Sequence, residues 1–171
     1  PGHYRRFAGG ATLSFRVDPP QDCYSPRNVL SGVTRPSEST NLWRSDPTEP
    51  LPQWLELAWD SPQTVSQVQV TFEGQLLREY HAYPPFYRDP QTVADYEIQA
   101  RVGERWKTLV AARGNTATRV VHTLDEAVET TAIRLLVQGT NGDPSAGVFE
   151  FRCYASEVCT PESFGPQVLE S

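Results

Sequence analysis

The chain has 171 residues, which suits one domain, and 38% of them are hydrophobic, which is enough to close a single core. Fifteen Lys and Arg against twenty-one Asp and Glu give a net charge of -6, so a nucleic-acid partner held through its phosphates is not expected. No apolar run approaches the roughly 20 residues that cross a bilayer, and no signal-peptide pattern is present, so no membrane partner is expected either.

The first half of the chain predicts three strands and one long loop. Residues 11–17 alternate apolar and polar side chains and predict an edge strand within an N-terminal extension, residues 1–22. Residues 26–50 are rich in Ser, Thr, Pro and Asn and indicate a long ordered loop. Residues 54–59 and 65–72 alternate again, and the turn residues 60–63 separate these two strands.

The second half starts with a break in this rhythm. Residues 73–95 hold many aromatic residues and prolines without a period and are interpreted as a loop. Alternation then predicts strands in four further runs, residues 96–109, 118–124, 132–137 and 147–154. Turn residues, not helices, join the strands, so we expect an all-β antiparallel sandwich. Residues 156–171 show no periodicity and predict a poorly ordered tail.

The tryptophans and cysteines give more specific expectations. Trp43 and Trp106 are expected in the core, whereas Trp54 and Trp59 have opposite strand phase, so one of these two should lie on an outer or partly covered face. Cys153 alternates in phase with two phenylalanines, a pattern typical of a small buried hydrophobe.

The other two cysteines, Cys23 and Cys159, flank the strand-rich region. We hypothesise a disulfide between them, which fits an oxidising, secreted or periplasmic location. Structural zinc is not expected, because the cysteines are few and lie far from any pair of histidines.

The order of motifs resembles the discoidin or coagulation factor 5/8 type C family, whose galactose-binding-like jelly rolls include many carbohydrate-binding modules. The matching pieces run through residues 23–155, which we take as the domain: Asn28–Val33, Trp43–Ser45, Trp54–Leu57, Val65–Val70, Tyr96–Gln99, Trp106–Leu109, Ile133–Leu135 and Ala146–Tyr154. The resemblance implies a jelly roll of about eight strands.

A closer resemblance is to the discoidin-like domain at the C-terminal end of bacterial FAD-dependent oxidoreductases. It rests on residues 31–36, 41–47, 93–98 and 140–150. The flavin site would lie elsewhere, because this chain has no Gly-x-Gly-x-x-Gly turn opening a helix.

Together the resemblances predict a non-catalytic carbohydrate-binding module that binds a polysaccharide or glycan through loops at one end of the sandwich. The alternative is an accessory domain, structural or in contact with a parent catalytic domain, with no ligand of its own. An enzyme ranks third. Asp89, Asp95 and Glu97 are carboxylates of the kind that glycosidases pair, but the sequence does not place them at a useful separation.

Aromatic and donor-bearing residues of one loop are the candidate ligand surface, since rings stack on sugars while donors bond hydroxyls. They are Tyr80, His81, Tyr83, Phe86, Tyr87 and Arg88. Such a loop can instead fold onto the sandwich and bury its own rings. Arg35, Arg44 and Arg88 are candidates to clamp a sugar carboxylate, or are ordinary surface charges.

The resemblance also implies a structural calcium site between the first long loop, residues 31–40, and Glu150 on the last strand. Ser31-Gly32 stands where the family has Asp-Gly, so this loop offers fewer of the hard oxygen ligands that calcium prefers. No other cofactor is expected.

Overall fold

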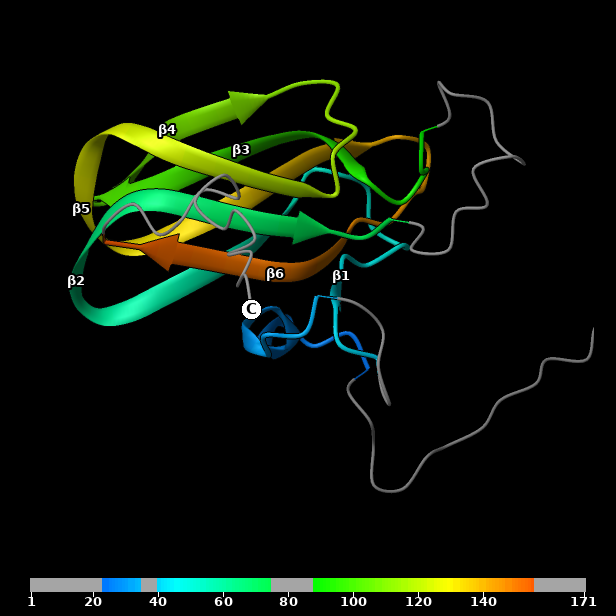
Figure 1. The fold of residues 1–171 in the computed structure, drawn as a ribbon, viewed down its shortest axis with the longest axis horizontal. Coiled ribbons are helices and arrows are strands. Elements are labelled where there is room, and N and C mark those ends of the chain that lie inside the picture. The colour runs from blue at the N-terminus through cyan, green and yellow to red at the C-terminus, as the bar shows by residue number, and fades with distance from the viewer. Residues whose placement is uncertain (1–22, 35–39, 75–87, 156–171) are drawn as a thin grey trace, which may run out of the picture.

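The computed structural model describes residues 23–34, 40–74 and 88–155. A 3-10 helix, η1 (Pro26–Leu30), precedes six strands: β1 (Trp43–Arg44), β2 (Gln53–Phe72), β3 (Val93–Val102), β4 (Arg105–Ala112), β5 (Arg119–Thr140) and β6 (Gly147–Tyr154). They are hydrogen-bonded in the order β1-β6-β2-β5-β3-β4, antiparallel throughout (Figure 1). No helix within the described ranges is long and apolar enough to span a bilayer. The strand expected at residues 11–17 lies outside them.

Two long strands build both layers of the molecule. β2 and β5 pair along almost their whole length, and the register breaks between Ala58 and Gln63, where both strands curve over one end of the molecule (Figure 1). Beyond this bend, residues 63–72 of β2 pair with the start of β5 and with β6, while residues 53–58 pair with the end of β5.

The first sheet therefore consists of β1, β6 and the adjoining halves of β2 and β5, and the second of their other halves with β3 and β4. These eight segments form the expected antiparallel jelly-roll sandwich. The expectation of an all-β fold is confirmed.

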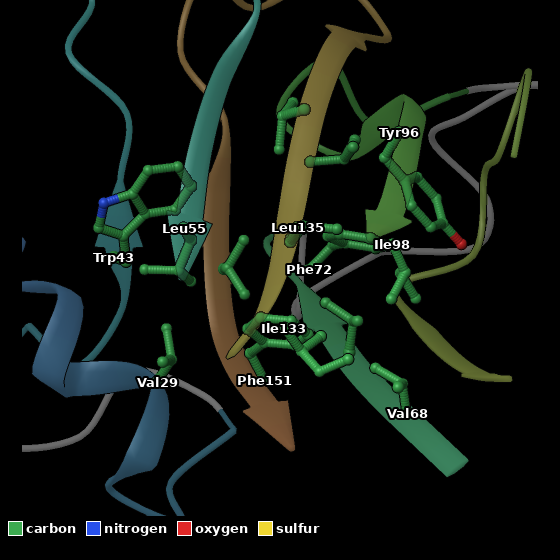
Figure 2. Packing of buried hydrophobic residues seen from close by; sticks show 14 of the residues in the cluster. Val29, Trp43, Leu55, Val68, Phe72, Tyr96, Ile98, Ile133, Leu135 and Phe151 are labelled. Atoms are coloured by element: carbon green, nitrogen blue, oxygen red, sulfur yellow. The ribbon is translucent and has the colours of Figure 1, made fainter. Parts of the chain in front are cut away.

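The core lies between the sheets. Its largest fully buried side chains include Phe72 and Phe151 from the first sheet and Tyr96, Ile98 and Leu135 from the second (Figure 2). The rings of Phe72 and Tyr96 are 5.1 Å apart, and inward residues at alternate positions keep each strand in phase.

Three predicted strand boundaries are wrong. Residues 60–63 form no chain reversal, because the extended backbone continues through the bend as one strand. The segments 118–124 and 132–137 likewise belong to the single strand β5. The run 96–109 is two strands, because Gly103, with φ +62°, opens a tight turn between β3 and β4. Alternation marks extended backbone but does not show whether a strand bends or reverses.

Three of the four tryptophans lie where the sequence predicts. Trp43 is buried, Trp59 packs against the core, and Trp54 is 55% exposed, so these expectations are confirmed. The expectation for Trp106 is wrong. Its ring is half-buried, lies opposite the exposed Arg101 and carries the guanidinium of Arg134, 4.2 Å from the ring centroid.

Cys153 is half-buried and packs against the core as expected. Burial raises the pKa of its thiol to about 12, so the thiol is protonated at neutral pH. Cys23 is exposed, but Cys159 lies outside the described residues, and the disulfide stays a prediction.

Candidate functional site

The end of the sandwich opposite the β2 and β5 bend gathers five chain segments, and we call it the loop end. They are the start of β1, the end of β2, residues 88–92, residues 113–118 and residues 141–146, seen at the right in Figure 1. Backbone hydrogen bonds join them: the Asn141 amide donates to the Thr92 carbonyl at 3.1 Å, and the Asp143 amide donates to the Pro90 carbonyl at 3.1 Å. The loops are thus tied to one another.

Asparagine and serine side chains strengthen these ties. The Asn141 amide group donates to the carbonyls of Thr92 and Asn115 at 3.1 and 3.0 Å, so three loops share one side chain. The buried Ser145 hydroxyl donates to the Ser45 carbonyl at 2.6 Å, and the Ser45 hydroxyl accepts from the Ala146 amide at 2.9 Å. Such bonds satisfy the buried backbone and fix the loop end as a rigid platform.

Arg44 lies at the centre of a charged cluster on this platform. Its guanidinium forms an ion pair with Glu73 and lies 3.8 Å from an oxygen of Asp143, and it sits over the ring of Tyr24 at 5.7 Å. Burial raises the pKa of the Glu73 carboxyl, and the charge of Arg44 partly offsets this rise. Arg44 is therefore already engaged by two carboxylates, and its role as a carboxylate clamp stays a prediction.

Among the other candidates, Arg88 is exposed at the loop end, directly after residues 75–87. Arg35 and five members of the predicted ligand surface, Tyr80, His81, Tyr83, Phe86 and Tyr87, lie outside the described residues. Gly74 and Asp89, which flank residues 75–87, lie close together at the loop end, because a Cβ added at Gly74 would be 3.2 Å from Asp89 Oδ2.

The carboxylates weighed for catalysis have structural partners. Asp95 accepts from the Gly114 amide at 2.8 Å, and Glu97 accepts from Gln99, Thr108 and Gln138 at 2.7 to 3.1 Å. These bonds lower the pKa of the Glu97 carboxyl, and the bond from Gln99 is the largest cause. A carboxylate held ionised in this way does not act as a general acid near neutral pH.

Glu150, the predicted calcium ligand, binds its neighbour on the strand. Its Oε1 accepts from Arg152 Nε at 3.0 Å and from the Arg152 NH2 group at 2.7 Å. Within the described ranges no three His, Cys, Asp or Glu side chains form a group that could hold a metal. Part of the predicted loop, residues 35–39, lies outside those ranges, and calcium stays a prediction.

The described part of the chain forms hollows on its surface. One of about 450 Å³ borders the loop end and is lined by residues that include Thr34, Gly74 and Glu150. Another, of about 490 Å³, lies between η1 and the edges of β2 and β6, where Trp59 and Tyr154 line it. Sequence reasoning missed this second hollow, because it arises where separate strands and η1 meet.

Sequence reasoning also missed Glu73 and Asp143 as partners of Arg44. They lie 29 and 99 positions along the chain from it, so only the folded chain brings the three together. The nearest signal is the turn-rich run 140–145, which on its own indicates only a link between strands.

No protein-family model and no curated protein matches the chain. Solved structures do resemble it. The family 32 carbohydrate-binding module of Streptococcus pneumoniae EndoD shares 18% identity at a TM-score of 0.63, covering 80% of this chain and 88% of that one. The family 32 module of C. perfringens NanJ, in complex with galactose, shares 15% identity at a TM-score of 0.59, covering 78% and 86%.

A third likeness is to chitosan-binding module 2 of a chitosanase/glucanase from Paenibacillus sp. IK-5, in complex with chitotriose. It shares 16% identity at a TM-score of 0.58 and covers 78% of this chain and 88% of that one. Each match covers 86–88% of the solved chain. The chain therefore has the jelly-roll sandwich fold of these carbohydrate-binding modules.

Proposed function

We propose that the protein is a non-catalytic carbohydrate-binding module whose loop end binds a polysaccharide or glycan. The observation that carries the proposal is the likeness, over 78% of the chain, to modules in complex with galactose and with chitotriose. The rigid platform at the loop end supports it, because ties such as those of Asn141 fix the loops before a ligand arrives. Such a module would act outside the cytoplasm, in a secreted or periplasmic protein.

Arg88 is the described residue best placed to contact the sugar. It is exposed and adjoins the aromatic segment, so its guanidinium can bond sugar hydroxyls or a carboxylate beside a stacked ring. Monosaccharide affinity should be weak, because a shallow wet site gains little from each hydroxyl.

A glycan array followed by affinity gels tests the proposal. We expect saturable binding to one glycan class and a roughly tenfold loss in Arg88→Ala, the cost of one charge-assisted hydrogen bond. Arg105→Ala is the matched control, because it removes the same charge at the β3–β4 turn, at the other end of the sandwich. Runs with calcium and with a chelator test the predicted site at Glu150.

A protein-contact domain is the second candidate, and three exposed apolar side chains around η1 favour it: Tyr24, Leu30 and Val33. A parent enzyme of the FAD-dependent oxidoreductase type would then supply the partner surface. If the protein binds no glycan of the panel, glycan binding is overturned and the protein-contact domain is favoured.

A further inference from the structure

The outer face of the second sheet carries a diagonal line of three side chains. Trp54 on β2 lies opposite Leu136 on β5, and Arg134, two residues before Leu136, is its diagonal neighbour. Arg134 in turn lies opposite Gln99 on β3, and Arg101 is the next diagonal neighbour. Diagonal neighbours lie about 7–8 Å apart, so the line is about 15 Å long. We call it the sheet-face track.

Arg134 is held in place by two neighbours on this face. Its Nε donates to Gln99 Oε1 at 2.7 Å, and its guanidinium carbon lies 4.2 Å from the centroid of the Trp106 ring. Gln99 is itself fixed, because its amide donates to Glu97 and Thr108 at 2.7 and 3.2 Å. These two contacts hold the flat guanidinium of Arg134 in place before a ligand binds. Among the described residues, none accepts a hydrogen bond from its NH1 or NH2 group.

The track carries two positive charges, Arg134 and Arg101, in a protein whose net charge is -6. Two acids also share the outer face. Glu97 lies 3.5 Å from Arg113, and Glu56 lies opposite Arg134 in register without an ion pair between them.

Trp54 adds an exposed aromatic ring to this face. Trp54 is 55% exposed, and on the outer face its apolar neighbour Leu136 lies beside the charged Arg134 and Glu56. A protein partner would need a contiguous apolar patch, which this mixture of apolar and charged side chains does not offer. A ring beside preorganised donors fits a hydroxyl-bearing ligand, and the spare guanidinium groups fit a carboxylate on it.

We propose that the sheet-face track is a second binding surface, for a polysaccharide chain that carries carboxylate groups. Trp54 stacks on one sugar ring, Arg134 and Arg101 bind carboxylates further along the chain, and Trp106 positions Arg134. The surface is independent of the loop end, since it lies on the outer face of the second sheet, away from the loops that tie β1, β3 and β6 together.

Affinity electrophoresis of the full chain in gels containing polygalacturonate tests this surface. We expect wild-type retardation that saturates and falls with salt, and an affinity about tenfold lower in Trp54→Ala and in Arg101→Ala. Lys107→Ala is the matched control for charge, because Lys107 lies opposite the inward-facing Ala100 and so points away from the track. Thermal melts verify that each variant is folded.

Variants at two more positions distinguish the track from the loop end and test the role of Trp106. For polygalacturonate, Arg101→Ala should lose more affinity than Arg88→Ala, because Arg88 lies at the loop end and not on the track. Trp106→Phe should bind like wild type and Trp106→Ala should not, because a ring is needed to hold the guanidinium of Arg134.

Three results would overturn the proposal. The wild type is not retarded, or Trp54→Ala and Arg101→Ala are retarded as strongly as the wild type, or Lys107→Ala loses as much affinity as the track variants. The last would mean unspecific charge attraction. Loss in Arg88→Ala with retention in the track variants would move the acidic chain to the loop end.

Discussion

A single missing side chain makes room for the ion pair of Arg44 and Glu73. Gly147 begins β6 directly beside Glu73, and a Cβ added there would lie 2.7 Å from the Glu73 Cβ, which is closer than real Cβ contacts come. The Glu73 amide also donates to the Gly147 carbonyl at 2.9 Å, so the two backbones cannot easily move apart. Position 147 therefore requires glycine for space.

We predict that Gly147→Ala destabilises the protein by about 1–3 kcal/mol, the usual cost of overpacking. Urea unfolding measures it. Gly139→Ala is the control, since the added methyl would make only ordinary contacts of 3.5 Å or more with Asp95. In a Glu73→Gly background the penalty should shrink, because the obstructing Cβ is absent. An equal loss in both backgrounds would show that Glu73 is not the obstacle.

This cluster also shows what residue patterns leave open. The sequence points to Arg44 as a ligand clamp, but its partners Glu73 and Asp143 are distant along the chain and carry no local signal. The burial of Trp43 follows the general tendency of tryptophan to be buried, whereas the half-buried place of Trp106 on an outer face follows from its pairing with Arg101.

At the scale of the element, the β3–β4 hairpin depends on Gly103. Val102 pairs with Arg105, so only Gly103 and Glu104 form the loop, and two-residue loops of this kind need a residue with positive φ. Gly103 has φ +62°, and nothing lies within 4 Å of the position a Cβ would take. Any cost of a side chain there is therefore conformational, not steric crowding by neighbours.

We predict that Gly103→Ala lowers the free energy of unfolding by about 1–2 kcal/mol, the cost of a left-handed residue. Gly103→Asn should lose less, because asparagine visits this conformation more readily. Urea unfolding of both variants checks the order. Equal losses would point to a contact with the side chain instead.

The hairpin and the bend illustrate why the strands are predicted more reliably than their ends. Alternation marks the extended segments of the second half, although it joins β3 to β4 and divides β5. It gives no warning that Gly103 reverses the chain whereas residues 60–63 do not, since both stretches carry turn-forming residues. Pairing with β5 on both sides of the bend keeps β2 extended there.

At the scale of the whole molecule, the order of motifs carries the fold, and the pairing register supplies what residue patterns leave out. Trp54, Arg134 and Arg101 belong to three strands far apart in the chain, and they align only because β2, β5 and β3 pair in one register. A prediction of strands without their register cannot find such a line.

One hydrogen bond between the two sheets ties stability to pH. The Tyr96 hydroxyl on β3 lies 2.9 Å from His122 Nε2 on the first-sheet half of β5. Burial lowers the pKa of His122 below its ordinary 6.5, so the folded protein takes up this proton less readily than the unfolded chain. Protonation of His122 therefore favours the unfolded chain. The free energy of unfolding falls as the pH falls from above 6.5 through the lowered pKa of His122.

Tyr96 makes stability depend on pH at the alkaline end. Burial raises the pKa of its hydroxyl from 10.0 to about 12, so the free energy of unfolding should fall as the pH rises across that interval. We predict that the free energy of unfolding in urea declines between about pH 7.5 and about pH 5, and that His122→Gln, which does not titrate, declines less over the same range. Tyr96→Phe should weaken the alkaline decline and leave the acidic decline in place. If His122→Gln and the wild type lose stability in parallel below pH 6.5, the acid sensitivity lies in other groups.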